Sequence, residues 1–451
     1  MKIPALPGFN PEAFEKYFKN TGWLLLARVG SLFVKMLVTS FALPSYLGSA
    51  NFGTYNYPLV LLAFFTGIAT MGTDGLITRQ LLQHPEKEKV LLGSALRIRV
   101  ITGFLVLPLV YLTYFLITHF APEAPAASFK QVALVSLICI IQAVQIIDSF
   151  FQAQVKGKMI MIVQVGGNVL SAAIKLTLIL LKAPLDAFIW TLVFDVIILQ
   201  LGYLALYHKL GHRISAWKYD KTTAKELIKL GWPLAFSSLF ITFYMKIDQL
   251  MIDALLGKSA LGVYSIVVSL SESWYFMPVA ISTSLFPAIM NARKGSPELY
   301  QKRLGNLYEL MVFVSVSVAL VVTFMAPFLF KYYYAPEYGE GLHTLQVHIW
   351  AGVFTFLGTA SAQFLIAEGL TKITLYRTAF GAIINVILNY IFIPKFGIIG
   401  AAYATLIAYF ASTFFLIFIK RTRPNAILMI RSLFLLGLLS TVKEKFLKIN
   451  R

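Results

Sequence analysis

The pattern that decides the fold is visible in residues 85–120, which read PEKEKVLLGSALRIRVITGFLVLPLVYLTYFLITHF. A charged loop opens this stretch, and a run of mostly apolar residues then continues from about residue 93 to residue 118. A helix needs about 20 apolar residues to cross the hydrocarbon core of a bilayer. The run is long enough, so we interpret it as a membrane-spanning helix that begins beside a basic loop.

Eleven other apolar segments of similar length alternate with short polar connections along the 451-residue chain. Hydrophobic residues make up 58% of the composition, charged residues only 13%, and the mean hydropathy is +0.75. A soluble domain contains about 25% charged residues, so the composition predicts an all-α integral membrane protein. The twelve predicted spans lie near residues 21–43, 55–77, 93–118, 130–151, 160–181, 186–207, 230–252, 262–286, 307–330, 342–365, 373–393 and 398–419.

Lysine and arginine are concentrated in every second connection between the predicted spans. One side of the membrane receives 26 of these residues and the other side receives 5. Positive charge marks the cytoplasmic side, so we place both termini in the cytoplasm. Short loops and the lack of a signal peptide indicate a prokaryotic plasma (inner) membrane. The net charge of +19 then faces anionic lipid headgroups, and we expect no nucleic-acid partner.

The chain contains an internal repeat. Residues 47–55 read LGSANFGTY and residues 256–264 read LGKSALGVY, at an offset of 209. A second register, at an offset of 214, pairs Ala153 with Ala367, Lys158 with Lys372, Gly167 with Gly381, Ala187 with Ala401 and Thr191 with Thr405. The repeat predicts two pseudo-symmetric six-helix lobes, which is the usual logic of alternating-access transporters.

The repeat also predicts how the chain is divided. We expect a cytoplasmic or interfacial lead (1–20), an N-terminal lobe (21–207), a basic cytoplasmic linker (208–229), a C-terminal lobe (230–420) and a basic cytoplasmic tail (421–451). The tail carries an apolar run over residues 427–440 that is short for a span. We interpret it as an interfacial helix, with a thirteenth span as the alternative.

Ionisable side chains inside the predicted spans are few, and each is costly at bilayer depth. Arg28 and Lys35 share one face of the first span because they are seven residues apart. Lys175 lies in the fifth span and Lys246 in the seventh. We predict that these four cations line a water-filled cavity that attracts an anion.

Acidic residues in the spans offer a second role. Asp248 or Glu272 could carry a proton or a sodium ion that couples transport to a gradient. Asp195 is a further acid, inside the sixth span. The alternative is that the charges pair with one another, for example Lys246 with Glu272, and serve only the structure. For any single acid the structural interpretation is favoured.

No catalytic residues and no metal site can be assigned from the sequence. His343 and His348 lack accompanying carboxylates, and the single cysteine, Cys139, excludes cysteine-based metal clusters and intramolecular disulfides. A phosphate-binding loop for ATP is not present. We therefore expect a protein that is not an enzyme, that has no cofactor, and that takes its energy from a proton or sodium gradient.

Several motifs resemble those of one transporter family. The stretch from Tyr46 to Tyr55 resembles the polysaccharide flippases of the Wzx type, in the multidrug/oligosaccharidyl-lipid/polysaccharide (MOP) exporter superfamily. The resemblance covers nearly the whole chain, and its other features are Gln152 with Lys156-Gly157-Lys158, Trp232-Pro233-Leu234, Asp248-Gln249, Ala367-Glu368-Gly369 and residues 395–402 (KFGIIGAA).

The resemblance implies two six-helix lobes in a V around a cationic lumen, with lipid-linked oligosaccharide as cargo. The diphosphate of this cargo would be attracted by Arg28, Lys35, Lys175 and Lys246. This role is assigned to them by their charge and location, and not by a shared motif. A proton or sodium gradient would drive alternating access. The partners would be membrane lipids, a polysaccharide polymerase and glycosyltransferases, and we expect a monomer.

Two other members of the superfamily are the alternatives. Lipid II flippases are similar but have two further spans that form a lipid groove. Multidrug exporters handle cations and favour acids in the N-terminal lobe, whereas the first span here carries Arg28 and Lys35. A membrane polysaccharide polymerase or ligase is the alternative from another class, but such an enzyme needs a large external loop, and the predicted outer loops are short.

Overall fold

The computed structural model describes residues 11–293 and 296–434. Within these ranges the regular secondary structure is helical, with no strand. The helices form two compact units, and the boundary between them falls inside α10 (Lys221–Leu256). Unit 1 comprises Met1–Lys246 with Gly257–Gly262, and unit 2 comprises Ile247–Leu256 with Val263–Arg451. The all-α fold is therefore confirmed, whereas the lobe boundaries predicted from the repeat stay a prediction.

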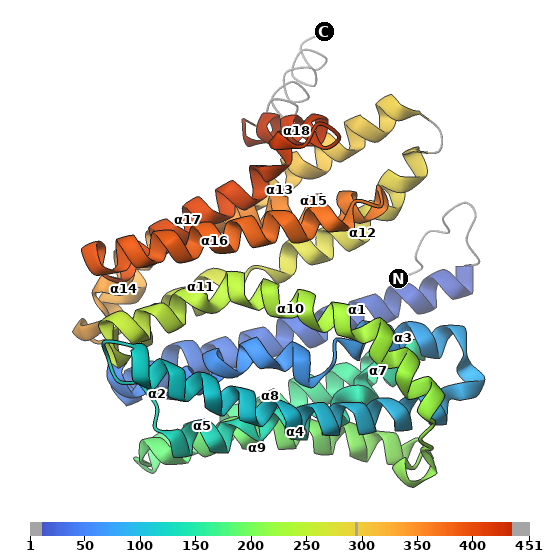
Figure 1. Ribbon diagram of the computed structural model, residues 1–451, viewed down its shortest axis with the longest axis horizontal. Helices are drawn as coiled ribbons and strands as arrows, with labels where there is room; N and C mark the ends of the chain where they lie inside the picture. Colours follow the sequence, from blue (N-terminus) through green and yellow to red (C-terminus); the bar gives the residue numbers. More distant parts are fainter. Residues whose placement is uncertain (1–10, 294–295, 435–451) are drawn as a thin grey trace. The chain divides into compact units, whose positions relative to one another are not determined.

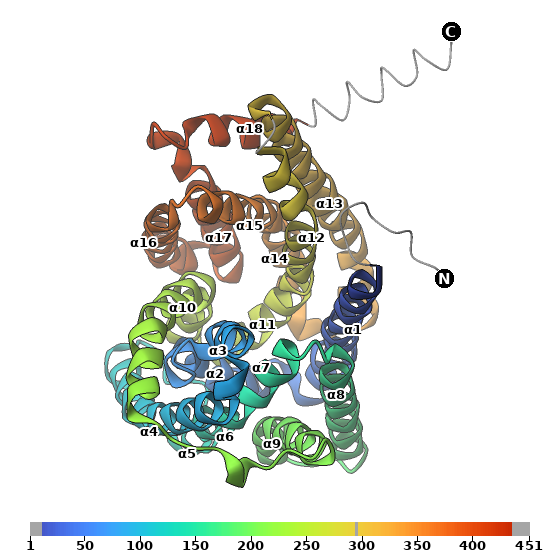
Figure 2. The same ribbon diagram turned by 90° about the vertical axis from the view of Figure 1, so that its right-hand side faces the viewer.

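Unit 1 begins with two long helices joined by a π-helical segment (Figure 1). The wider turn of a π-helix occurs mostly near functional sites, and this one follows directly on Lys35. Helix α1 packs along α8, as Figure 2 shows. The elements of unit 1 are α1 (Pro11–Lys35), η1 (Met36–Ala42), α2 (Leu43–Ala69), α3 (Thr73–Gln83), η2 (Pro85–Lys87), α4 (Glu88–Phe120), α5 (Phe129–Ser136), α6 (Ile138–Ile141), η3 (Gln142–Gln145), α7 (Ile146–Ala153), α8 (Gly157–Leu180), α9 (Leu185–Lys209), η4 (Ile214–Ala216) and most of α10.

Unit 2 contains the end of α10 and most of the helices that follow it. Helices α16 and α17 lie side by side in both views (Figures 1 and 2). The elements are α11 (Lys258–Glu272), whose first turn belongs to unit 1, α12 (Phe276–Arg293), α13 (Pro297–Tyr332), η5 (Pro336–Tyr338), α14 (Glu340–His348), α15 (Ala351–Ala367), α16 (Thr371–Phe396), α17 (Ile398–Phe414), η6 (Phe415–Phe418) and α18 (Arg423–Leu433).

Each unit has its own apolar core. In unit 1 the core includes the aromatic side chains of Phe150 and Tyr207, with their ring centroids 5.1 Å apart. In unit 2 the corresponding cluster includes Tyr308 and Phe356, both almost fully buried. Many large apolar side chains elsewhere are exposed, which is the arrangement expected of helices whose outer faces are solvated by lipid.

Nine helical segments in the described residues are long and apolar enough to cross a membrane, or ten if one bent pair counts as a span. The first, Gly22–Gln83, has 62 residues and covers two predicted spans. It is kinked at Gly48, where a positive φ of 75° interrupts the helix. The protein is therefore a multi-pass membrane protein, and the count of twelve spans and the cytoplasmic termini stay predictions.

Two predicted spans are broken helices. The segment 262–286 is divided between α11 and α12, and the segment 342–365 between α14 and α15, which bend by 42°. Hydropathy alone does not detect such breaks because the apolar run continues through them. Of the tail segment 427–440, the residues up to Leu433 form the end of α18, and those from 435 onward lie outside the described residues.

The repeated L-G-x-x-x-x-G-x-Y motif forms a reciprocal contact within unit 1. A Cβ atom on Gly53 would overlap the carbonyl oxygen of Lys258, and a Cβ atom on Gly262 would overlap that of Ser49. The Ser49 and Ser259 hydroxyls are hydrogen-bonded at 2.7 Å beside it. The second glycine of each motif copy therefore allows the backbones of α2 and the start of α11 to touch.

Candidate functional site

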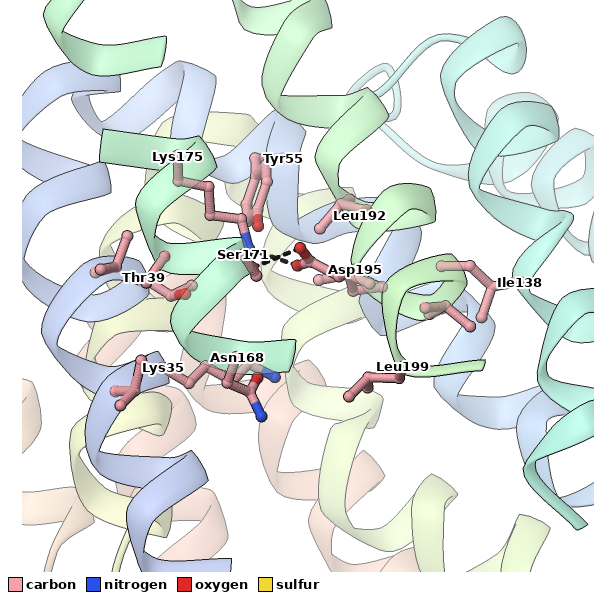
Figure 3. Close-up of a pocket in the computed structure, with 15 residues that line it drawn as sticks. Lys35, Thr39, Tyr55, Ile138, Asn168, Ser171, Lys175, Leu192, Asp195 and Leu199 are labelled. Atoms are coloured by element: carbon pink, nitrogen blue, oxygen red, sulfur yellow. Dashed lines mark hydrogen bonds and ion pairs between the residues drawn. The ribbon is translucent and has the colours of Figure 1, made fainter. Parts of the chain in front are cut away.

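The polar cavity of unit 1 has a volume of about 240 Å³ and brings two of the predicted cations together. Lys35 at the end of α1 and Lys175 on α8 both line it, and the remaining wall comes from η1, α2, α6 and α9 (Figure 3). Both lysines belong to segments that hydropathy marks as membrane-spanning. A charged group at that depth is costly unless it faces water or a partner, so this cavity is the candidate site.

Lys175 is held by an ion pair with Asp195 of α9. Its ammonium lies 2.5 Å from Asp195 Oδ2 and donates to the Ser171 hydroxyl at 3.1 Å. The Ser171 hydroxyl in turn donates to Asp195 Oδ1 at 2.5 Å. The Lys175 side chain is 5% exposed and that of Asp195 is 28% exposed. Asp195 is therefore the more accessible member of the pair.

Lys35 lies at the other end of the cavity, next to Asn168 (Figure 3). Its side chain is exposed, and it makes no ion pair with any acid of the described residues within 4 Å. Thr39 of the π-helix and Tyr55 of α2 complete the polar lining, and the Tyr55 hydroxyl points toward Lys175. Among the described residues, the cavity thus has a lysine with no ion pair at one end and a lysine paired with Asp195 at the other.

The other two predicted cations do not line this cavity. Arg28 is exposed on α1, two turns before Lys35, on the same helix face. Lys246 is half-buried near the end of unit 1. The structure therefore brings together Lys35 and Lys175 out of the four residues that sequence reasoning selected.

Asp248 lies in unit 2, where it is buried among polar side chains. The Tyr264 hydroxyl donates to Asp248 Oδ2 at 2.6 Å, and the Thr405 hydroxyl donates to the same oxygen at 3.4 Å. Asn385 donates to Thr405 Oγ1 at 3.4 Å, and Asn389 donates to Asn385 Oδ1 at 2.9 Å. Asp248 is 4% exposed, so its carboxylate sits at the end of a buried chain of hydrogen bonds.

Glu272, the second predicted coupling acid, is half-buried at the last residue of α11. Among the described residues, no group of three or more His, Cys, Asp or Glu side chains is arranged to hold a metal ion.

Sequence reasoning did not select Tyr55, Asn168, Ser171 or Asp195 as cavity residues. Asn168 and Ser171 precede Lys175 by seven and four residues, so all three lie on one face of α8, and this spacing was a usable signal. Asp195 was noted only as one of several acids in the spans. Its pairing with Lys175 depends on the register between α8 and α9, which no spacing along one chain reveals.

A second ion pair of unit 1 lies away from the cavity, with its arginine buried and its carboxylate exposed. Arg99 of α4 is fully buried and donates to Asp74 at 2.6 Å and to the Thr73 hydroxyl at 2.9 Å. Both acceptors lie in the first turn of α3, where an acidic side chain also favours the helix dipole. This pair joins α3 to α4.

The family model described as "Polysaccharide biosynthesis protein" matches residues 17–293, which is more than half of the chain. The chain belongs to this family. A second model, MatE, matches residues 233–391. The chain is 23% identical over 49% of its length to the capsular polysaccharide biosynthesis protein CapF of Staphylococcus aureus, covering 55% of that protein. It is 24% identical over 53% of its length to the probable flippase AglR of Haloferax volcanii, covering 50% of that protein.

These matches span about half the length of those curated relatives, but solved structures match nearly end to end. An inward-facing multidrug resistance transporter of the MATE family has a TM-score of 0.69 at 14% identity, over 91% of this chain and 96% of that one. The lipid II flippase MurJ has a TM-score of 0.66 at 17% identity, over 94% and 93%. The resemblance to polysaccharide flippases of the MOP superfamily is therefore confirmed, and the protein has the fold of that superfamily.

Proposed function

We propose that the protein moves a polyprenyl-diphosphate-linked oligosaccharide from the cytoplasmic to the outer leaflet of a prokaryotic plasma membrane, for surface polysaccharide synthesis. The observation that carries this proposal is the meeting of Lys35 and Lys175 in one polar cavity of a membrane-embedded unit. Ammonium groups bind phosphate oxygens through charge-assisted hydrogen bonds. A diphosphate would gain these bonds in the cavity while its lipid tail stayed in the bilayer.

Arg28 extends the cationic path along α1. It lies seven residues before Lys35, or about 10 Å along the helix axis at 1.5 Å per residue. An exposed arginine at that distance can attract the anion before Lys35 receives it, since a fixed charge steers an approaching ligand of opposite sign. Lys246 is assigned the same role at the end of unit 1. Glycosyltransferases would act before the transporter and a polymerase would act after it. The transporter is proposed to work as a monomer.

Asp248 is proposed to couple transport to a proton or sodium gradient, with Glu272 as the second candidate. What supports Asp248 is burial of the carboxylate together with its Tyr264 and Thr405 hydrogen bonds. A buried carboxylate is stabilised by taking up a cation or a proton. Binding in one conformation and release in another would tie the ion to the movement of cargo.

The test uses a deletion strain of the source organism, and it measures on which membrane face sugar-loaded polyprenyl diphosphate accumulates. We expect accumulation on the cytoplasmic face, rescued by the wild-type gene and not by the Arg28→Ala/Lys35→Ala double variant. Asp186→Asn, which changes an exposed acid of α9 outside the cavity, should rescue fully. Normal arrival of the lipid-linked sugar at the outer face of the deletion strain would contradict the proposal.

Drug export is the second candidate, because the MatE model matches residues 233–391. In the same deletion strain this function predicts raised sensitivity to cationic drugs with an unchanged distribution of lipid-linked sugars. The two lysines in the cavity favour an anionic cargo over a cationic one.

A further inference from the structure

The cavity of unit 1 contains an acid that competes with any anion for Lys175. We propose that Asp195 is an exchangeable counter-ion: it holds Lys175 while the cavity is empty, and an incoming diphosphate displaces it. This inference rests on the proposed function for the identity of the cargo, and it adds a positioning residue that sets how tightly the cargo is held.

The order of exposure supports an exchange. Lys175 is 5% exposed, whereas the Asp195 side chain is 28% exposed and lines the same cavity (Figure 3). An anion that enters from the Lys35 end therefore meets the carboxylate before it reaches the second ammonium. It can contact Lys175 only if Asp195 moves aside.

Ser171 gives the displaced carboxylate a partner. Its hydroxyl already donates to Asp195 Oδ1, while Lys175 occupies only Oδ2. Asp195 can thus release the ammonium and keep one hydrogen bond, so it need not be left without a polar contact. A buried acid that lost every partner would be far more costly to displace.

The exchange also explains how a site with two ammonium groups can release its cargo. A transport site must bind strongly enough to load and weakly enough to unload. When only a fraction of the protein has Lys175 available, the apparent affinity is reduced by that fraction. Asp195, tethered beside Lys175, restores the original ion pair as the anion leaves.

The experiment measures binding of inorganic pyrophosphate to the purified full-length protein in nanodiscs by calorimetry, together with the unfolding temperature. Asp195→Asn removes the competing charge and leaves Lys175 buried without its counter-ion. We expect pyrophosphate to bind at least about tenfold more tightly than to wild type. Without ligand the variant should unfold at a lower temperature than wild type, and pyrophosphate should raise that temperature by more than it does for wild type.

Matched variants separate exchange from a purely structural ion pair. Lys175→Asn and Lys35→Gln should weaken pyrophosphate binding, and Asp186→Asn on the same helix should leave it unchanged. Asp195→Glu keeps the charge and should stay within about threefold of wild type, since the competition is electrostatic. Asp195→Asn that folds but binds pyrophosphate no more tightly than wild type would overturn the proposal, as would Asp195→Glu that tightens binding equally.

The proposal can still be tested if Asp195→Asn does not fold on its own. If Asp195→Asn is recovered only when pyrophosphate is present during purification, the anion has replaced the missing carboxylate, as expected. If pyrophosphate does not recover it, the exchange is wrong. Pyrophosphate binding is measured without any glycan, so a failure of the leaflet assay would remove the proposed function and leave this result standing.

Discussion

The polar clusters of the two units occupy equivalent places in the internal repeat but differ in where they carry charge. The equivalent pairs are Thr39 with Asp248, Tyr55 with Tyr264, Ser171 with Asn385, Lys175 with Asn389 and Thr191 with Thr405, at the offsets of 209 and 214 found in the sequence. In unit 1 the carboxylate comes from α9 and meets a lysine, beside an open cavity. In unit 2 the carboxylate comes from α10, and an asparagine stands at the lysine's place.

The difference in charged groups shows how two repeat-related halves can present different chemistry on the same helical framework. Tyr55 and Tyr264 keep the same place in both halves, so the hydroxyl framework is shared. We propose that the ammonium fixed to the chain suits unit 1 to an anion, and that the buried Asp248 carboxylate, held by the Tyr264 and Thr405 hydroxyls, suits unit 2 to a proton or a mobile cation. This division fits the proposed roles of Lys175 and Asp248.

The largest expected effect comes from neutralising Asp248. Asp248→Asn should remove the dependence of transport on the gradient, because a neutral amide cannot release a proton or balance a cation. For one coupled charge, the ratio of lipid-linked glycan between outer and inner leaflets should fall by about fiftyfold per 100 mV of membrane potential, the equivalent of about 2.3 kcal/mol. The measurement is this ratio in inverted vesicles, with and without an ionophore.

Thr39→Val is the matched control in unit 1. It removes a hydroxyl at the position equivalent to Asp248, and the same ratio should change by less than about fivefold, the value of one hydrogen bond. Gradient dependence that survives in Asp248→Asn, or disappears in Thr39→Val, would break the comparison between the two clusters.

A second pair of variants compares stability at the lysine position. Lys175→Asn leaves Asp195 partly buried with Ser171 as its remaining hydrogen-bond donor, and should lower the free energy of unfolding by about 3 kcal/mol. Asn389→Ala removes a neutral hydrogen bond to Asn385 and should cost only about 1 kcal/mol. The measurement is a denaturant titration in mixed micelles. Equal losses would show that the Lys175 ion pair contributes no more than an amide does.

A third comparison tests whether the two motif copies are equivalent in packing. Gly53→Ala and Gly262→Ala each place a methyl group against a backbone carbonyl, so each should lower the free energy of unfolding by about 2 kcal/mol. Gly75→Ala, in the open surroundings of α3, should be neutral or slightly stabilising because alanine favours a helix. The same denaturant titration applies, and unequal losses at the two motif glycines would show that the contact is not reciprocal.

The smallest effect is expected outside both clusters, at the start of α10. Hydrogen bonds from the backbone and hydroxyl of Thr223 lower the pKa of Asp220 below the ordinary value of 3.8. A lowered pKa means that the stabilisation is present above pH 3.8 and is lost as the pH falls through the folded-state pKa. Asp220→Ala should therefore reduce the unfolding temperature slightly at pH 7, and this difference should shrink below pH 3.8. A difference that grows on acidification would contradict the assignment.

The sequence was sufficient for the class of protein and for the family. Hydropathy and charge patterning predicted an all-α multi-pass membrane protein because lipid imposes length and apolarity on each span separately. The loose motifs around Tyr46 to Tyr55 predicted the polysaccharide flippase family, which the match over residues 17–293 confirms. Both inferences depend on local patterns that can be read from a single sequence.

The candidate site was predictable only in part. Lys35 and Lys175 were selected because buried charge is rare in a span, and the structure places them in one cavity. Arg28 and Lys246 met the same criterion but do not line it. The partner of Lys175 was not identified, since Asp195 reaches it across two helices whose relative register depends on packing along their whole length. The breaks between α11 and α12 and between α14 and α15 were not predicted, because the apolar run continues through each of them.

The reciprocal contact of Gly53 and Gly262 also bears on the evolutionary history of the chain. In a dimer with twofold symmetry, one residue type occupies both sides of the interface and a single substitution acts twice. Here each glycine meets the backbone of the other motif copy, which is the arrangement that fusion of two identical genes would preserve. Once fused, the two positions can mutate independently, yet a side chain at either one separates the same pair of backbones. The contact therefore places one joint constraint on two positions that lie 209 residues apart in the sequence.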